Sequence, residues 1–302
     1  MQLVHGAVGA QPSPVLTIGN FDGVHVGHRA LLALTRSLAD TLQAPATALT
    51  FDPSPAEVLR SDRPLQRLQS LDHRLASLQE AGIDRVVLLP FTRALAALSP
   101  EAFTTQVLVG ALGARGFALG HDFRFGAKRA GTADTLRRLV DVPVRQVDPV
   151  LIDGSPVSST RIRAALAGGD VANAARLLGR AHCVGGRVVA GDQRGRTLGF
   201  PTANVAVTSG LLPANGVYAV HVIEGTDGAA RPGVANLGNR PTFRTSGRTF
   251  EVHLLDFSGD LYDRTLNVSF AQRLRGERRF DGRDALIEAI ENDVRAARSL
   301  FR

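Results

Sequence analysis

The first 180 residues alternate short apolar runs, which favour β-strands, with amphipathic segments, which favour helices. Consecutive parallel strands need such a helix, because it carries the chain back across the sheet to the start of the next strand. We therefore expect a doubly wound parallel sheet that binds ligands at the carboxyl ends of its strands. The predicted strands are 15–18, 46–51, 85–91, 116–120 and 143–152, and the predicted helices are 28–43, 67–81, 100–112 and 160–167.

The pattern changes near Gly179, beyond which short strand-like runs are separated by Gly, Pro and Asn. Such spacing is typical of a compact antiparallel β-barrel. One amphipathic helix closes the chain, and its stripe of Leu286, Ile287, Ile290 and Val294 is expected to be a core face. We therefore predict two domains, 1–181 and 182–302. The predicted strands of the second are 183–190, 204–207, 216–223, 232–237, 249–256 and 265–270.

A segment rich in glycine and histidine, Gly19-Asn-Phe-Asp-Gly-Val-His-Val-Gly-His28, joins the strand 15–18 to the following helix. A helix N-terminus offers free N–H groups and a positive dipole end, which suit a phosphate. Gly23 and Gly27 allow close approach, and His25 and His28 fall on one side of the helix entry as hydrogen-bond donors. An isolated His-x-x-His would be read as surface histidines. Here the strand, the glycines and the helix start agree, which favours nucleotide binding.

Three further segments of the first half carry polar residues at predicted strand or helix ends. Phe51-Asp-Pro-Ser-Pro55 and Gly120-His-Asp-Phe-Arg-Phe-Gly126 each follow a strand, and a basic loop, 127–132, comes next. Ser158-Ser-Thr-Arg-Ile-Arg163 begins a helix, where its hydroxyls can cap and its arginines can reach phosphates. Each segment alone is explained equally well as a turn, a loop or a capped helix.

In the second half, residues 186–204 combine four glycines, an arginine pair and Pro201-Thr-Ala-Asn204. Glycines permit a backbone nest around phosphates. The Thr202 hydroxyl and the Asn204 amide are hard oxygen ligands suited to Mg²⁺. An ordinary barrel loop is the plainer interpretation, but the string is more specific than such a loop requires.

Composition limits the remaining classes of function. The net charge is +7 and the pI is about 10.9, so nucleic acid has to be considered as a partner. The arginines are scattered among acidic residues, however, and Lys128 is the only lysine, which excludes a P-loop. The single Cys183 rules out an intramolecular disulfide and suits a reducing cytosol. With no secretory signal and no apolar span of membrane length, we expect a cytoplasmic protein that binds neither membrane nor nucleic acid.

The segment 19–28 resembles the His-x-Gly-His nucleotidyltransferases, in the form found in prokaryotic bifunctional riboflavin kinase/FAD synthetases. The resemblance implies a Rossmann-like domain that transfers AMP from ATP to FMN, giving FAD and pyrophosphate. It implies that His28 and Arg161 are catalytic and that Asp122 and Phe123 line the nucleotide and flavin pocket. The remaining residues implied to bind ATP are Gly19, Phe21, Asp22, Gly23, His25, Gly27, Ser159 and Thr160.

The second half resembles the riboflavin kinase domain of the same family. Gly195-Arg-Thr-Leu-Gly-Phe-Pro-Thr-Ala-Asn204 is similar to its signature, and 233–243, 249–257 and 274–280 are similar to its later motifs. The resemblance implies that Glu251 is the base that activates the riboflavin 5′-hydroxyl. It also implies Thr202 and Asn204 as ligands of Mg²⁺, with ATP and flavin bound by Gly191, Gly195, Arg196, Gly199 and Arg275.

Two residues depart from the family pattern: Ser54 replaces a longer polar residue, and Asp263 replaces a glycine. We leave Ser54 out of the site and expect Asp263 to reshape a turn. Two other functions stay open. A chain that keeps only one of the two activities is the first, and a nucleic-acid-binding protein is the second. The sequence also leaves self-association and the choice between Mg²⁺ and Mn²⁺ open.

Overall fold

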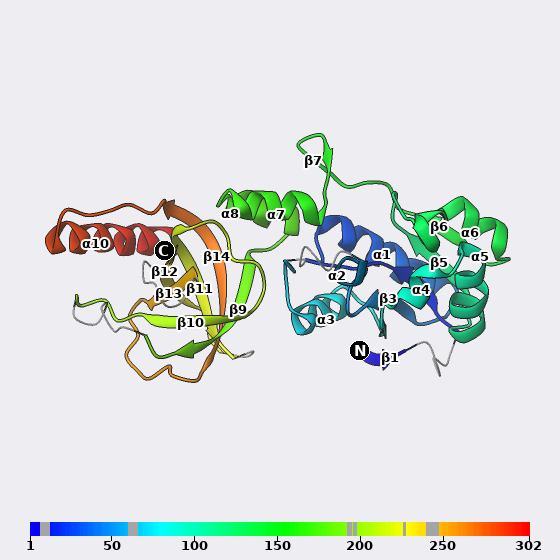
Figure 1. The fold of residues 1–302 in the computed structure, drawn as a ribbon, viewed down its shortest axis with the longest axis horizontal. Coiled ribbons are helices and arrows are strands. Elements are labelled where there is room, and N and C mark those ends of the chain that lie inside the picture. Colours follow the sequence, from blue (N-terminus) through cyan, green and yellow to red (C-terminus); the bar gives the residue numbers. More distant parts are fainter. Residues whose placement is uncertain (7–12, 60–65, 192–194, 196–197, 226–227, 240–247) are drawn as a thin grey trace. The chain divides into compact units, whose positions relative to one another are not determined.

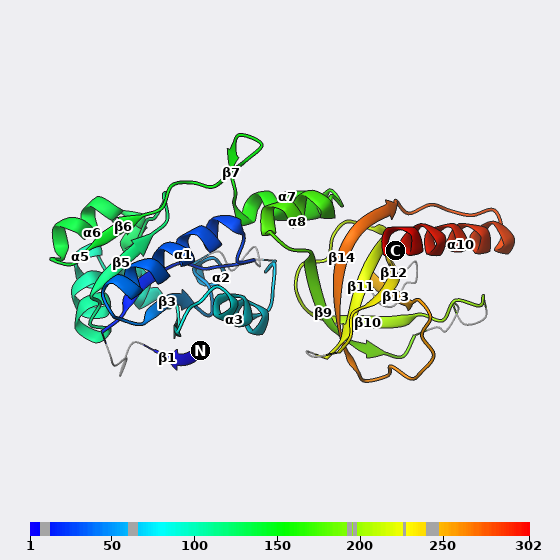
Figure 2. The same ribbon diagram turned by 180° about the vertical axis from the view of Figure 1, so that it is seen from behind.

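The computed structural model describes residues 1–6, 13–59, 66–191, 195, 198–225, 228–239 and 248–302. Contacts between residues divide the chain into two compact units (Figures 1 and 2). Unit 1 contains Met1–Gln66 and Ser70–Ser158, and unit 2 contains Arg67–Gln69 and Ser159–Arg302. Each unit has its own sheet and its own core, as the change of pattern in the sequence predicts.

Unit 1 is built on a six-stranded sheet in which every neighbouring pair is parallel. The strand order reverses at β2: β3 and β4 lie on one side of it, and β5 and β6 lie on the other. Such a reversal is where doubly wound sheets bind ligands. The expected fold class is thus confirmed. The strands, in their order across the sheet, are β1 Gln2–His5, β4 Arg85–Leu89, β3 Ala46–Phe51, β2 Val15–Ile18, β5 Gly116–Leu119 and β6 Val144–Gln146.

Helices cover both faces of this sheet. On one face, α1 (Val26–Thr41) and α3 (Leu71–Glu80) bury leucines against the strands. On the other face, α5 (Pro100–Phe103), η1 (Thr104–Ala111) and α6 (Ala133–Leu139) form a second core. Two buried faces explain why the four central strands, β2 to β5, are buried throughout and read as largely apolar runs.

Several elements of unit 1 differ from the prediction. The helix expected over 100–112 is a short α-helix that continues as a π-helix, η1. The strand expected over 143–152 is broken after β6, and its end forms a small hairpin of β7 (Leu151–Ile152) with β8 (Ser155–Pro156). The short elements β1, α6, α2 (Pro55–Leu59) and α4 (Arg93–Ala97) were not predicted, because they are too short for a periodic signal.

Unit 2 is a closed antiparallel barrel, which confirms the predicted architecture. Its interior is filled by aromatic and branched side chains, among them Tyr218, Phe250 and Phe270. The strands, in their order around the barrel, are β10 Ala203–Ser209, β13 Arg248–Leu254, β12 Arg231–Asn239, β11 Gly216–Glu224, β14 Thr265–Arg275 and β9 His182–Val189.

Two helices that precede the barrel in the sequence pack against it. Helix α8 (Val171–Leu178) contacts β9 and β14 and pairs with α7 (Ser159–Ala167), as both ribbon views show. The carbonyl of Leu166 accepts a 2.8 Å hydrogen bond from the Ala214 N–H. By contacts, therefore, both helices belong to unit 2, and the functional boundary at 181/182 stays a prediction.

The last helix, α10 (Arg283–Leu300), lies across the outer surface of β11, β12 and β14 (Figure 1). Its buried residues are Ala289, Asp293 and Ala297. The predicted core stripe is only half-buried, so its interpretation as a core face was incomplete: Leu286, Ile290 and Val294 line a pocket between helix and barrel.

His182 gives the barrel a pH-dependent stability. Its side chain is 2% exposed, and its Nε2 lies 2.6 Å from the Leu211 carbonyl oxygen, so Nε2 carries the proton. Burial lowers the pKa of His182 to about 4. In the unfolded chain His182 binds a second proton near pH 6.5, whereas in the folded chain it does so only near pH 4. The contribution of His182 to the free energy of unfolding is therefore complete above pH 6.5 and is lost, by about 3 kcal/mol, as the pH falls towards 4.

We predict that His182→Gln, which keeps a donor for Leu211 but cannot titrate, makes barrel stability less dependent on pH between 7 and 4. Urea unfolding followed by tyrosine fluorescence measures this, because the chain has no tryptophan and both tyrosines, Tyr218 and Tyr262, belong to unit 2. The same pH dependence in both proteins would show that His182 is not the titrating group.

Candidate functional site

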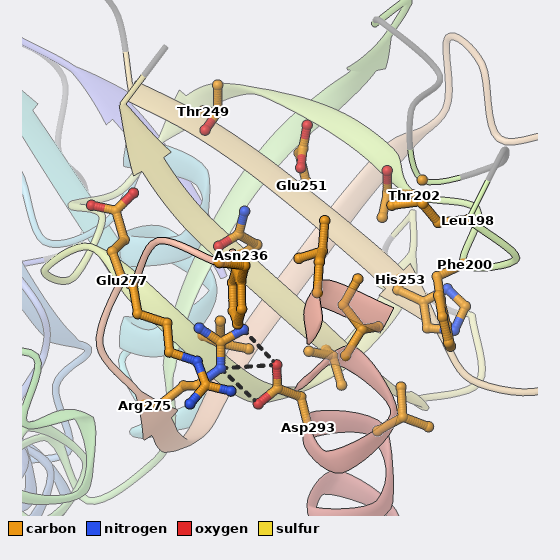
Figure 3. Close-up of a pocket in the computed structure, with 18 of the residues that line it drawn as sticks. Leu198, Phe200, Thr202, Asn236, Thr249, Glu251, His253, Arg275, Glu277 and Asp293 are labelled. Atoms are coloured by element: carbon orange, nitrogen blue, oxygen red, sulfur yellow. Dashed lines mark hydrogen bonds and ion pairs between the residues drawn. The ribbon is translucent and has the colours of Figure 1, made fainter. Parts of the chain in front are cut away.

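A pocket of about 410 Å³ lies between the outer surface of the barrel and α10 (Figure 3). Its polar wall comes from the barrel strands and from the loop before β10. Its apolar wall comes from Leu286, Ile290 and Val294 of α10, with Val217 and Val234 of the barrel. A pocket with one polar and one apolar wall suits a small molecule that has both polar and apolar parts.

The register of the strands decides which side chains share this pocket. Asn204 on β10 pairs with Glu251 on β13, Glu251 pairs with Asn236 on β12, and Asn236 pairs with Val217 on β11. Val217 in turn pairs with Arg275 on β14. Directly paired residues of a ladder point to the same side of the sheet. We call these five residues the pocket row, and all of them line the pocket.

The pocket row faces outward from the barrel. On β13, Thr249, Glu251 and His253 line the pocket and are half-buried. The residues between them are buried, as expected where alternate side chains point to opposite faces: Phe250, Val252 and Leu254. Figure 3 shows Glu251 near Thr202 and Thr249 in the pocket wall.

Two glycines allow the predicted metal ligands to be approached closely. A Cβ at Gly191 would overlap the Asn204 amide, and a Cβ at Gly195 would overlap the Phe200 carbonyl and lie 3.1 Å from the Thr202 hydroxyl. Gly195 and Phe200 are joined by a 2.9 Å hydrogen bond from the Phe200 N–H to the Gly195 carbonyl, which closes a turn before Thr202. Glycine is therefore needed at position 195, where the overlap is with backbone, while a larger residue at position 191 would have to displace the Asn204 side chain.

His253 fixes this turn to the barrel. Its Nδ1 lies 2.8 Å from the Pro201 carbonyl oxygen, so Nδ1 donates, and its ring meets Phe200 edge-on with centroids 5.8 Å apart. The carbonyl that precedes Thr202 is thereby attached to the same strand as Glu251. The loop and the carboxylate are positioned by one element.

Five residues predicted from the sequence line this one pocket: Gly195, Thr202, Asn204, Glu251 and Arg275. Gly191 adjoins Asn204, and Gly199 has φ +89° in the same turn. Arg196 lies outside the described residues. The roles assigned to all of them stay predictions.

Sequence reasoning missed several pocket residues. Asn236 stands inside a motif noted in the sequence, but nothing there distinguished it from its neighbours. His253 and Thr249 could have been found from strand alternation with Glu251. Asp293 gave no signal, since an acidic residue in an amphipathic helix normally points to solvent.

Asp293 and Arg275 form an ion pair at the base of the pocket (Figure 3). Nε of Arg275 lies 3.0 Å from Oδ1 and 3.1 Å from Oδ2 of Asp293, and Nη2 lies 2.8 Å from Oδ2. The guanidinium also lies over the Phe280 ring, 5.4 Å from its centroid. Arg275 is therefore held on two sides.

In unit 1, three of the predicted segments follow three adjacent strands. The segment 19–28 follows β2, the segment with Ser54 follows β3, and 120–126 follows β5. They thus meet at the carboxyl edge of the sheet where the strand order reverses, as expected. Phe21 and Val24, in the first segment, have φ of +49° and +38°. Positive φ at a β-branched residue is rare and is often found at functional loops.

The two histidines of this segment form a pair at the start of α1. His25 caps the helix, since its Nδ1 accepts a 3.2 Å hydrogen bond from the His28 N–H. The two rings stack with centroids 3.6 Å apart, and Phe21 meets His28 edge-on. Nδ1 of His28 is buried and has no hydrogen-bond partner among the described residues.

This environment favours a neutral His28. Burial lowers its pKa well below the usual 6.5, and the neighbouring His25 lowers it further. A neutral imidazole can still donate one hydrogen bond, but it brings no positive charge to a phosphate.

The other predicted residues of the nucleotide site are placed as follows. Asp122 is exposed, and Phe123 is half-buried and stacks on Phe125 with centroids 5.4 Å apart. Ser159, Thr160 and Arg161 begin α7, which belongs to unit 2. That these three residues share one nucleotide site with His25 and His28 stays a prediction.

The two departures from the family pattern have local consequences. Ser54 is 4% exposed, and its N–H donates a 2.7 Å hydrogen bond to Glu57. Asp263 has φ +63°, a conformation that favours glycine, and pairs with Arg187 at 3.1 Å. Asp263 therefore adopts the left-handed backbone conformation that glycine adopts more easily, which costs some conformational free energy.

We predict that His28 stays neutral throughout the range from pH 6 to 8. Long-range ¹⁵N–¹H NMR of labelled protein distinguishes neutral from charged imidazole, and a His28→Asn sample assigns the signal. A His28 resonance that titrates near pH 6.5 or above would contradict the proposed burial effect.

Comparisons with known proteins cover both units. The FAD synthetase family matches residues 9–161, and the riboflavin kinase family matches residues 178–301. A bifunctional riboflavin kinase/FMN adenylyltransferase of Pseudomonas fluorescens is 45% identical over 99% of this chain and 98% of its own length. The enzymes of the same name from Escherichia coli K12 and Bacillus subtilis are 40% and 34% identical, over 98% and 93% of their lengths.

A solved structure agrees with the fold of the whole chain. The crystal structure described as a macrolide-efflux protein from Streptococcus pneumoniae has a TM-score of 0.90 and 31% identity, covering 99% of both chains. Among the described residues of the present protein, none of the helices has the length and apolar character needed to span a membrane. With both family matches in the predicted order and relatives of 40% and 45% identity over nearly their full length, the chain belongs to the bifunctional riboflavin kinase/FMN adenylyltransferases.

Proposed function

We propose that riboflavin is phosphorylated in the barrel pocket and that FMN is adenylylated at the loops following β2, β3 and β5. The protein makes FMN from riboflavin and ATP, and then FAD and pyrophosphate from FMN and a second ATP. The observation that carries the kinase assignment is the pocket row. Its ladder places Glu251 between the amides of Asn204 and Asn236, within a pocket that also contains Thr202.

Glu251 is the proposed general base of the kinase reaction. The riboflavin 5′-hydroxyl is a neutral nucleophile, so a carboxylate that accepts its proton assists attack on the γ-phosphorus of ATP. The bond formed is from the 5′-oxygen to phosphorus, the bond broken is from phosphorus to the β–γ bridging oxygen, and ADP leaves. Asn236, on the other side of Glu251 from Asn204, is positioned to orient the hydroxyl or the base.

The donor set fits Mg²⁺ bound together with nucleotide. Thr202 and Asn204 offer neutral oxygens at the pocket wall, with closely packed glycine backbone around them. Among the described residues there is no cluster of three or more His, Cys, Asp or Glu that would bind a cation unaided. Such a site suits an ion that takes most of its ligands from phosphates and water. Mg²⁺ would supply charge neutralisation on the phosphates of ATP.

The apolar wall of α10 is the proposed surface for the flavin ring. Leu286 and Ile290 are half-buried and accessible from the pocket, so a flat apolar ring can cover them. This accounts for a helical stripe that the protein leaves incompletely buried. The ribityl chain would then extend along the pocket row towards Glu251.

The adenylyltransferase reaction needs no base, because the FMN phosphate has a second pKa near ~6 and is already an anion. Its site has to align two polyanions and stabilise charge on the α-phosphate and the departing pyrophosphate. His28 supplies a preorganised, neutral hydrogen bond. The positive charge comes from the start of helix α1 and from Arg161.

The remaining inferences concern partners and location. Among the described residues several arginines are paired with acidic residues, including Arg36 with Asp84 and Arg298 with Asp256, which supports the inference that nucleic acid is not a partner. Burial raises the pKa of the Cys183 thiol, which favours a reduced, unreactive cysteine. We infer a cytoplasmic enzyme that binds riboflavin, FMN and ATP, with self-association left open.

Glu251→Gln is predicted to reduce riboflavin phosphorylation by about 10²–10⁴-fold and to leave adenylylation of supplied FMN intact, since Gln keeps the shape but cannot accept the proton. Chromatographic separation of the flavins, with each half-reaction started from its own substrate, gives both rates. Kinase turnover at the wild-type level, under conditions where chemistry limits the rate, would place the base elsewhere.

His28→Ala is the converse variant. Loss of one preorganised donor to a transferring group should slow FAD formation by about 10²–10³-fold while FMN formation continues. The two variants serve as controls for each other in the same assay. An equal loss of both activities in His28→Ala would indicate misfolding or a shared site, and full FAD synthesis would remove His28 from the mechanism.

A further inference from the structure

We propose that Asp293, on the C-terminal helix, is a positioning residue that holds Arg275 for binding riboflavin. The inference rests on the proposed placement of the kinase reaction in the barrel pocket. It gives α10 a role in substrate binding in addition to its role in covering the barrel.

The burial of Asp293 points to this role. The residue is 7% exposed and lies on α10 among Ala289, Ile290 and Val294. A buried carboxylate is unfavourable unless it is paired and hydrogen-bonded. A helix that only had to cover the barrel would do so with an apolar residue at this position. Asp293 therefore needs Arg275, and the pairing restricts where the guanidinium can lie.

The geometry of the pair fixes Arg275 and leaves donors for a ligand. Three N–O distances of 2.8 to 3.1 Å join Nε and Nη2 to both carboxylate oxygens. Nη1 donates to the Gly276 carbonyl at 3.3 Å. A guanidinium has five N–H groups. One on each Nη is left without a partner among the described residues, and the pocket is lined by this side chain.

Arg275 also contacts the loop that follows it, through the ring of Phe280. Phe280 lies beneath the guanidinium of Arg275, and Arg278 lies over the same ring, 4.8 Å from its centroid. Phe280 and Arg278 both line the pocket. By fixing Arg275, Asp293 thus fixes part of the wall that β14 and the following loop contribute.

The position of Arg275 in the pocket row predicts which kinetic constant changes. Glu251 and Arg275 are separated by β12 and β11, three strand spacings, or about 14 Å along the barrel surface. Arg275 is therefore remote from the atoms that exchange the phosphoryl group. Its N–H groups suit the oxygen acceptors at the far end of a flavin whose 5′-hydroxyl lies at Glu251, so its displacement should weaken riboflavin binding more than turnover.

The test measures riboflavin kinase kinetics of the full chain with Asp293→Asn, which keeps the volume and removes the charge. We expect the KM for riboflavin to rise about tenfold and kcat to change less than threefold. Adenylylation of FMN should be unchanged. Asp293→Ser, which fits the same space, provides the measurement if Asp293→Asn does not fold.

Asp256→Asn is the matched control. It breaks a bidentate ion pair between Asp256, which follows β13, and Arg298 of the same helix, with two hydrogen bonds of 2.7 Å. Both side chains of this pair are exposed, and neither lines the pocket. We expect wild-type kinetics. A raised KM in this variant as well would mean that any disturbance of α10 has the effect, and would overturn the specific role of Asp293.

Arg275→Gln distinguishes the inference from the proposed function. It should raise the riboflavin KM as Asp293→Asn does, and combining the two should raise it no further. A raised KM in Arg275→Gln with wild-type constants in Asp293→Asn would overturn the role of Asp293 alone. Wild-type kinase kinetics in Arg275→Gln and Glu251→Gln together would place the kinase site elsewhere.

Discussion

The backbone ladder of the barrel decides which side chains can meet in the pocket. Because Glu251 pairs with Asn204 on one neighbouring strand and with Asn236 on the other, its side chain is flanked by those of two asparagines. A slip of one residue in either ladder would turn one partner into the barrel interior. The packed interior, with Phe250 and Val252 alternating with the site residues, therefore holds the site in register.

The two proposed sites would meet opposite chemical demands, and the residues proposed for them differ accordingly. A neutral hydroxyl nucleophile benefits from a carboxylate, which the pocket supplies on a rigid strand. A phosphate nucleophile is already an anion and needs no base. The loop after β2 instead presents stacked imidazoles and a helix start, with His25 committed as the helix cap and His28 kept neutral by burial. A neutral His28 can donate a hydrogen bond but carries no charge, so under the proposed function the charge stabilisation has to come from other groups.

The sequence predicted features that depend on local pattern, and the structure added those that depend on distant contacts. Strands β2 and β3 and the barrel strands were visible as apolar runs, and the glycine-rich motifs identified the family. The packing of α7 and α8 on the barrel was not predictable, because it depends on contacts such as Leu166 with Ala214, across residues far apart in sequence. The stripe on α10 was recognised, but whether it meets a core or a cavity depends on how the barrel surface complements it.

Asp293 shows why such a residue is hidden in a sequence. In the string Ile290-Glu-Asn-Asp-Val294 it is one of several polar residues, and only the fold shows that it is buried against Arg275. The ion pair joins Arg275, at the end of β14, to the helix that covers the barrel, so it links the apolar wall of the pocket to one end of the pocket row. A substrate that touches both walls is then recognised by a preorganised site, and little ordering of side chains opposes its binding.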